Sequence, residues 1–174
     1  GMGRSGHYFA YQHYGVLPDI VTMAKGLGGG FPIGAMLVAE KHAAVFEKGM
    51  HGTTFGGNHL ATAVAYEVIR TIEAEKILDH VKASARYLTS ALNKLKEKYP
   101  DKITEVRGLG LLIGIVFVDS IEARPLIEKA LQLGLIVGRG GNSVLRLAPP
   151  LNVRKTTMDA AVEKLDQLVA GIQL

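Results

Sequence analysis

The chain has 174 residues, an apolar fraction of 48%, a charged fraction of 21% and a formal net charge of +4. This length is enough for one domain or two small lobes with a buried core, and the composition is ordinary for a globular protein. The absence of cysteine excludes disulfides, thiolate metal sites and a cysteine nucleophile. It also suits a reducing compartment, so we expect a cytoplasmic protein.

The positive net charge does not predict a nucleic-acid partner. Lysine and arginine are interleaved with acidic residues, and the densest basic run, at residues 94–98, fits the solvent face of a helix end. The apolar run at 109–118 is about half as long as a membrane-spanning helix. We therefore expect neither nucleic acid nor a membrane as a partner. The six histidines lack metal-like spacing, so no metal site is expected.

The first part of the chain predicts loops and two strands. Residues 1–15 read as a loop with a short helix. The apolar run 19–24 predicts a buried strand that leads through Lys25 into a glycine-rich turn, and 32–39 predicts a second such strand. Continuous apolar strands of this kind are typical of a sheet covered on both faces.

Helical periodicity begins after Asn58, which can cap the helix that follows. Apolar residues recur at four-residue spacing from Leu60, and a second apolar stripe runs from Ile77 to Leu95. Pro100 bars continuation of this second helix.

The last part of the chain predicts a mixture of short strands and helices. Their expected positions are strands at 103–107 and 111–118 around Gly108 and Gly110, a helix at 121–133 closed by Gly134, strands at 135–137 and 144–147 flanking a glycine turn at 138–141, and a last helix from Thr157. The change in pattern divides the chain into residues 1–73 and 74–174.

Lys25 is the first candidate for chemistry. A lysine at the end of a buried strand is partly desolvated, which lowers the pKa of its amine and makes it a competent nucleophile toward a carbonyl. The glycines that follow let a bulky ligand approach the backbone. The alternative is a lysine that reaches solvent at a strand end, with the glycines serving only as a turn. A phosphate-cradling loop is a further alternative, although the P-loop order is absent.

The loop Thr53-Thr-Phe-Gly-Gly-Asn58 is the second candidate. Its hydroxyls and glycine amides stand immediately before a helix, where backbone N–H groups favour an anion such as a phosphate. The alternative is a plain turn with a helix N-cap.

Arg146 is the third candidate. It lies between apolar residues, where a buried arginine requires an anionic partner, and its planar fork matches a carboxylate. The alternative is an edge-strand arginine that points outward.

These candidates occur within an ordered series of motifs: Gly1-Met-Gly-Arg-Ser-Gly6, Phe9-Ala-Tyr-Gln-His-Tyr-Gly15, Pro18-Asp-Ile20, Ala24-Lys-Gly-Leu-Gly-Gly-Gly30, Pro32-Ile-Gly34, His51-Gly-Thr-Thr-Phe-Gly-Gly-Asn58, Arg107-Gly-Leu-Gly-Leu-Leu112 and Arg146-Leu-Ala-Pro-Pro150. The series covers nearly the whole chain. It resembles the class III (ornithine-type, fold type I) pyridoxal-phosphate aminotransferases, and most closely their acetylornithine group.

The resemblance implies a role for each candidate. Lys25 would link covalently to pyridoxal 5′-phosphate and shuttle a proton between the substrate and the cofactor. Thr54 would bind the cofactor phosphate across a homodimer interface. Arg146 would pair with the carboxylate of amino-acid and 2-oxo-acid substrates. His59 stands where the family usually has proline, from which we expect only a small adjustment of the loop.

The resemblance also implies an α/β fold. Residues 1–73 would be the C-terminal piece of the large-domain sheet that binds pyridoxal phosphate, and 74–174 a small α+β C-terminal domain. The N-terminal half of the subunit would be a missing partner, since the family's aspartate for the pyridinium nitrogen precedes the first matched motif. We therefore expect little or no transaminase activity from these 174 residues.

Three functions remain open from the sequence. The first is an aminotransferase of arginine biosynthesis that moves the amino group of N-acetylornithine, or of a related ω-amino donor, to 2-oxoglutarate. The second is a non-catalytic structural or dimerising fragment of such an enzyme. The third is an unrelated phosphate-binding protein.

Overall fold

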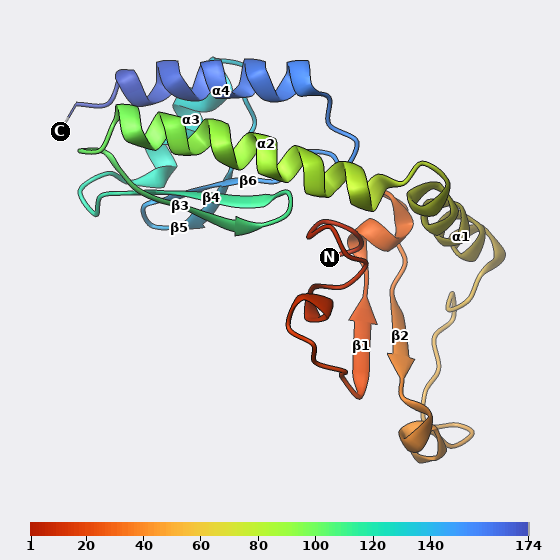
Figure 1. Ribbon diagram of the computed structural model, residues 1–174. Coiled ribbons are helices and arrows are strands. Elements are labelled where there is room, and N and C mark those ends of the chain that lie inside the picture. Colours follow the sequence, from red (N-terminus) through yellow and green to blue (C-terminus); the bar gives the residue numbers. More distant parts are fainter. Residues whose placement is uncertain (174) are drawn as a thin grey trace. The chain divides into compact units, whose positions relative to one another are not determined.

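The computed structural model describes residues 1–173, whose contacts divide into two compact units (Figure 1). The first unit contains residues 1–3 and 7–78, and the second contains residues 4–6 and 79–174. The boundary between them falls inside one long helix. Each unit has its own set of elements and its own core.

The first unit contains a two-stranded antiparallel sheet and one long helix. Its elements are η1 (Ala10–His13), β1 (Ile20–Met23), η2 (Lys25–Gly28), β2 (Ala35–Val38), η3 (Glu40–Val45) and α1 (His59–Ala74). Ile20 pairs with Val38 and Met23 with Ala35, so both predicted strands exist.

The prediction that these two strands are buried is wrong. Ile20 is 50% exposed and Leu37 is 53% exposed, and the burial of β1 alternates between exposed and half-buried. The reason is that each strand has a single neighbour within the described residues. Apolar side chains of β1 and β2 therefore remain exposed in this unit.

A small cluster joins the start of the chain to α1. Met2, Leu27 and Ala65 are buried together, and Phe9, Met23 and Ile33 pack against them. The Asn58 side chain accepts a hydrogen bond of 2.9 Å from the backbone N–H of Ala61, which confirms the predicted N-cap of α1.

The second unit packs helices against an antiparallel sheet. Its elements are most of α2 (Ile77–Lys98), followed by β3 (Ile103–Leu109), β4 (Leu112–Phe117), α3 (Ala123–Gln132), β5 (Gly138–Gly141), β6 (Val144–Leu147) and α4 (Lys155–Ala170). The strand order is β3-β4-β6-β5, and the helices lie on one face of the sheet (Figure 1). The largest fully buried side chains of this core are Phe117, Leu92, Ile103, Leu111, Ile113, Ile115, Leu145 and Leu165.

The glycine run 138–141 forms strand β5 and not the predicted turn. Gly138 pairs with Arg146 and Arg139 with Leu145, while 135–137 lie outside any strand. Hydrogen bonding to β6 outweighs the entropic cost of ordering glycine in a strand. The actual turn is confined to Asn142 and Ser143.

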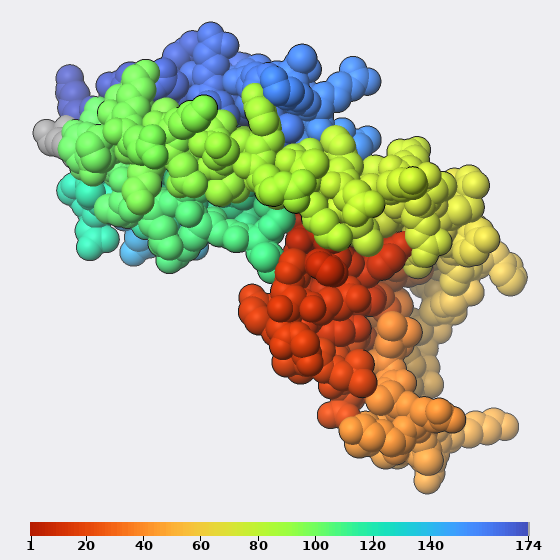
Figure 2. Space-filling view, viewed as in Figure 1, coloured from red at the N-terminus to blue at the C-terminus, as the bar shows by residue number. Residues whose placement is uncertain are grey.

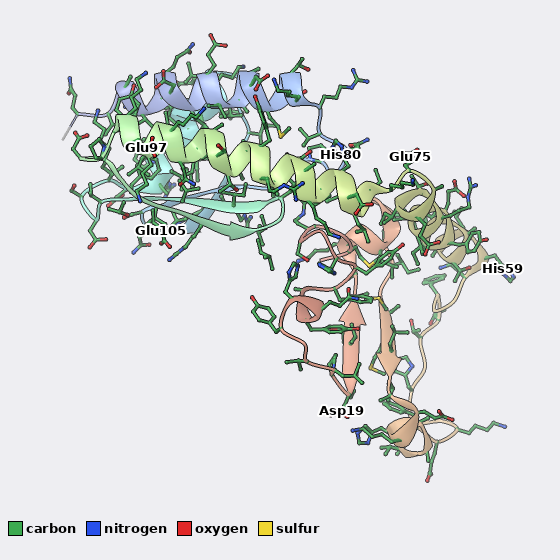
Figure 3. All side chains as sticks on the ribbon, viewed as in Figure 1. Asp19, His59, Glu75, His80, Glu97 and Glu105 are labelled. Atoms are coloured by element: carbon green, nitrogen blue, oxygen red, sulfur yellow. The ribbon has the colours of Figure 1, made fainter. Side chains whose placement is uncertain are left out.

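Helix α2 is fixed to the end of the chain by polar contacts. Lys98 donates to both carboxylate oxygens of Asp166 on α4, at 2.8 and 2.7 Å, and this contact lowers the pKa of Asp166. His80, labelled in Figure 3, lies 2.9 Å from the carbonyl oxygen of Val153 through Nε2. No helix within residues 1–173 combines the length and hydropathy of a transmembrane span.

Candidate functional site

Lys25 lies in the turn that follows β1. It is exposed, so the expected partial desolvation is absent from this chain, because the strand before it is itself not buried. Its φ of 52° places it in the left-handed region, directly after the extended Ala24. Among residues 1–173 its ammonium group has no hydrogen-bond or ion-pair partner. A non-glycine residue held in this region is often found at functional sites.

The residues after Lys25 hold this turn in place. Leu27 is 4% exposed and its N–H donates to the carbonyl of Ala24 at 3.1 Å. Gly29 has a φ of +56°, and a Cβ there would lie 3.0 Å from Cγ2 of Val68 on α1. The glycine run is thus required by close packing and by a left-handed turn, and it leaves the Lys25 side chain in solvent.

We predict that Lys25→Gly keeps or raises stability. The left-handed conformation costs a non-glycine residue about 1–2 kcal/mol, and the greater freedom of unfolded glycine offsets about 0.5–1 kcal/mol of the gain. Urea unfolding followed by circular dichroism should therefore give a chain up to about 1.5 kcal/mol more stable. Lys82→Gly, in the second turn of α2, should instead lose about 1 kcal/mol. Equal losses in both variants would show that the turn is not strained.

Thr54 lies in the exposed loop before α1. In this loop the N–H of Gly56 donates to the Thr53 carbonyl at 3.3 Å and the Asn58 side chain donates to the Phe55 carbonyl at 2.8 Å. The Thr54 hydroxyl has no hydrogen-bond partner among the described residues. The turn and the helix cap are therefore both present, and phosphate binding by Thr54 stays a prediction.

Arg146 occupies the open face of the second unit's sheet. It is exposed, whereas its neighbours Leu145 and Leu147 are buried on the opposite face. The expectation that Arg146 is buried among its apolar neighbours is therefore wrong, because side chains alternate along β6. The outward alternative is correct in direction, although β6 is an interior strand. Glu105 shares the face away from the helices (Figure 3).

Glycines flank Arg146 on both neighbouring strands. Gly114 of β4 and Gly138 of β5 are its direct partners in the two registers. The guanidinium lies beside Gly138, and it has no hydrogen bond or ion pair within residues 1–173. Among the residues that the structure describes, Arg146 is thus an unpaired cation on the exposed face of the sheet.

Arg4 is a structural residue of the second unit to which the sequence pattern gave no role. Its guanidinium Nη1 donates to the carbonyl oxygens of Leu111, at 3.0 Å, and Pro149, at 2.7 Å. Its own carbonyl accepts from the N–H of Leu111 at 2.9 Å. Burial lowers the pKa of this guanidinium from its ordinary value. Arg4 therefore ties together three of the motifs, and its membership of the first one was the only sequence signal for it.

The approach of Arg4 depends on Gly110. This glycine has a φ of +59°, and a Cβ there would lie 2.3 Å from the Arg4 carbonyl oxygen and 2.5 Å from the Cα of Ser5. Real Cβ atoms do not come so close to backbone, so only glycine fits. The second glycine of the motif Arg107-Gly-Leu-Gly thus has a steric explanation.

Comparison with known proteins identifies the family. The pattern of the family "Aminotransferase class-III" matches residues 1–169. The chain belongs to the class III aminotransferases. An acetylornithine aminotransferase of Synechocystis sp. is 45% identical over 174 residues, which are 99% of this chain and 40% of that protein. A succinylornithine transaminase of Photorhabdus laumondii is 45% identical over 171 residues, 97% of this chain and 42% of that protein.

Solved structures of this family agree with the fold. An N-acetylornithine aminotransferase from Stenotrophomonas maltophilia is similar with a TM-score of 0.86 and 35% identity, over 98% of this chain and 44% of that one. An S-selective transaminase from Arthrobacter sp. gives a TM-score of 0.91 and 30% identity, over 98% and 42%. The chain is therefore an α/β aminotransferase piece that spans about two fifths of the length of these relatives.

Class III aminotransferases use pyridoxal phosphate, and the residues present here are compatible with it. Within residues 1–173, Lys25 offers an unpaired amine on an exposed turn, and Thr54 offers an unpaired hydroxyl in a glycine loop before a helix. Both belong to the first unit, whereas Arg146 belongs to the second. The donor set in the first unit suits an aldehyde and a phosphate group, and the free guanidinium in the second suits a carboxylate.

Proposed function

We propose that this chain supplies part of a cytoplasmic aminotransferase of arginine biosynthesis, which moves the amino group of N-acetylornithine, or a related ω-amino donor, to 2-oxoglutarate. The observation that carries the proposal is the 45% identity with an acetylornithine aminotransferase over 99% of the chain. A succinylornithine transaminase at the same identity supports a donor of the acylated ornithine class.

Each candidate residue has a distinct task in this proposal. Lys25 would hold the cofactor through its amine, and the same amine would move a proton at the reacting carbon of the substrate. Thr54 and the neighbouring amides bind the phosphate, which the start of α1 favours electrostatically. Arg146 binds and orients a substrate carboxylate through its fork. When bound, pyridoxal phosphate supplies the electron sink that the protein's own side chains lack.

The exposed apolar surface of the first unit supports the proposal that other polypeptide segments bind to it. Its exposed large apolar side chains are Tyr14, Val16, Leu17, Ile20, Met36, Leu37, Val45, Phe46, Met50, Phe55, Leu60, Tyr66 and Ile69. So many in one small unit indicate an interaction surface, and Figure 2 shows that the segment around residues 40–56 projects from the rest of this unit. We propose that the remaining three fifths of the subunit and a second subunit cover this surface.

The test of the Lys25 assignment is covalent trapping. Pyridoxal phosphate is added to the 174-residue chain, mixed with the N-terminal part of the Synechocystis acetylornithine aminotransferase as a second polypeptide, and borohydride fixes any link. We expect one cofactor per chain, attached at Lys25 in the digested peptides. Lys41→Ala, which removes another exposed lysine of the same unit, should label as the native chain does, and Lys25→Ala should not.

The outcome also separates the alternatives. Labelling that is spread over several lysines, or that persists in Lys25→Ala, contradicts the proposed attachment. If specific labelling and turnover occur only in the mixture, they support the expectation that the 174 residues are inactive without the N-terminal part. Turnover by the 174 residues alone would contradict the expectation of an incomplete site.

A further inference from the structure

We infer that a groove beside α2 in the second unit binds an extended segment from the rest of the aminotransferase subunit, and that this segment carries two acidic side chains four residues apart. The inference rests on the proposed function, in which the remaining three fifths of the subunit bind these residues. It concerns a surface to which neither the motifs nor the sequence pattern gave a role.

The groove has a volume of about 590 Å³ and lies between α2 and the end of the β3–β4 hairpin. Gly108 and Gly110 line the hairpin side without adding side chains. A Cβ at either position would overlap backbone, that of Leu112 for Gly108 and that of Arg4 and Ser5 for Gly110, so this wall stays bare. The helix side consists of Ala85, Arg86, Thr89, Ser90, Asn93, Lys94 and Glu97. Every lining residue belongs to the second unit.

The polar side chains of the helix wall are available to a ligand. Thr89 is half-buried, and the others are exposed, namely Arg86, Ser90, Asn93, Lys94 and Glu97. Within residues 1–173 none of these side chains has a hydrogen bond or an ion pair, including between Lys94 and Glu97. The groove therefore offers two cations with hydroxyl and amide groups between them.

The separation of the two cations selects an elongated ligand. Arg86 and Lys94 are eight residues apart on α2, which is about 12 Å along the helix axis. Side chains of a helix lean toward its N-terminus, so Lys94 leans toward Ser90 while Arg86 leans away from it. The two charges therefore do not converge on one point. A single carboxylate or phosphate would pair with one of them only.

An extended polypeptide has a matching repeat. Residues i, i+2 and i+4 of a strand point to the same side, and i and i+4 are about 13 Å apart. Acidic side chains at i and i+4 can thus reach Arg86 and Lys94 together. The side chain at i+2 would meet the hydroxyls of Thr89 and Ser90, where a small polar residue fits. Glu97, labelled in Figure 3, lies one turn beyond Lys94 and would repel a third acidic side chain.

The experiment titrates the isotope-labelled 174-residue chain with the N-terminal part of the Synechocystis acetylornithine aminotransferase and follows backbone amides by NMR. The groove variants are Arg86→Glu with Lys94→Glu, which reverses both charges, and Arg86→Lys with Lys94→Arg, which keeps them. The control is Arg124→Glu with Lys129→Glu, the same charge change on exposed residues of α3.

We expect the amide signals of residues 85–97 and 108–110 to shift in the native chain. The charge-reversed groove should bind about tenfold more weakly or worse, because two attractions become repulsions. The charge-conserving variant and the α3 control should bind as the native chain does. The substituted groove side chains are exposed and, within residues 1–173, unpaired, so all variants should keep the native circular dichroism spectrum.

The results separate the inference from the proposed function. Shifts in the first unit and labelling of Lys25 in the mixture, without shifts at 85–97, overturn the groove as a binding site and keep the proposed function. Equal affinity of the native and charge-reversed chains, or an equal loss in the α3 control, overturns the role of Arg86 and Lys94. No shift in any signal, together with no labelling of Lys25, overturns the inference and the proposed function together.

Discussion

Replacing Gly110 with alanine should destabilise the second unit by roughly 3–5 kcal/mol, the sum of backbone strain and a steric clash. The φ of +59° alone disfavours any side chain, and the new Cβ would overlap the backbone of residues 4 and 5 at 2.3–2.7 Å. Backbone atoms cannot rotate away as a flexible side chain can. The segment that carries Arg4 would have to leave the surface, and its hydrogen bonds with Leu111 and Pro149 would be lost.

Gly134→Ala is the matched control for this prediction. Gly134 also has a positive φ, of +71°, but its nearest neighbour is the flexible end of Lys164 at 3.0 Å. Its replacement should cost only the strain of about 1–2 kcal/mol. Urea unfolding followed by circular dichroism measures both variants. Similar losses in the two proteins would show that the contact with residues 4 and 5 adds nothing.

Replacing Arg4 with alanine should cost about 2–4 kcal/mol. The change removes two charge-assisted hydrogen bonds and leaves the carbonyls of Leu111 and Pro149 without their donor, each loss being worth about 1–3 kcal/mol. Arg107→Ala is the control of the same residue type. Arg107 is exposed and, within residues 1–173, pairs only with Glu105 at 3.2 Å, so its loss should cost less than about 1 kcal/mol.

The two variants should not be additive, because both act on the same contact. If Gly110→Ala already displaces the segment, Arg4→Ala in that background should have almost no further effect. Full additivity in the double variant would mean that Arg4 keeps its bonds when Gly110 is replaced. That result would contradict the close approach as the reason for glycine at position 110.

Periodicity was sufficient to predict most of the secondary structure. The stripe from Ile77 to Leu95 became α2, and Pro100 ended it as expected, because helix amphipathicity and proline stereochemistry are local properties. The strands β1 and β2 also lie where the apolar runs predicted them. Their burial was predicted wrongly, since burial depends on neighbouring layers that periodicity does not describe.

The structural roles of the glycines were the feature least predictable from the sequence. The run 138–141 has the composition of a turn, and it forms a strand because β6 offers partners for its backbone. Nothing local distinguishes Gly110, which must admit the backbone of residues 4 and 5, from Gly138, whose backbone pairs with Arg146. Both roles depend on contacts with other segments of the folded chain.

The order of motifs in the sequence was enough to indicate the family. It also singled out Lys25, Thr54 and Arg146, because residue types that can bind an aldehyde, a phosphate and a carboxylate occur within those motifs. The tertiary structure decided how they are presented. Lys25 is exposed in a turn where its own φ is positive. Arg146 is exposed between two buried leucines of β6. Arg4 donates hydrogen bonds to backbone carbonyls of two motifs that lie far from it in the sequence. Exposure, strain and hydrogen bonding across more than a hundred residues arise only when the chain folds, since they depend on which segments come together.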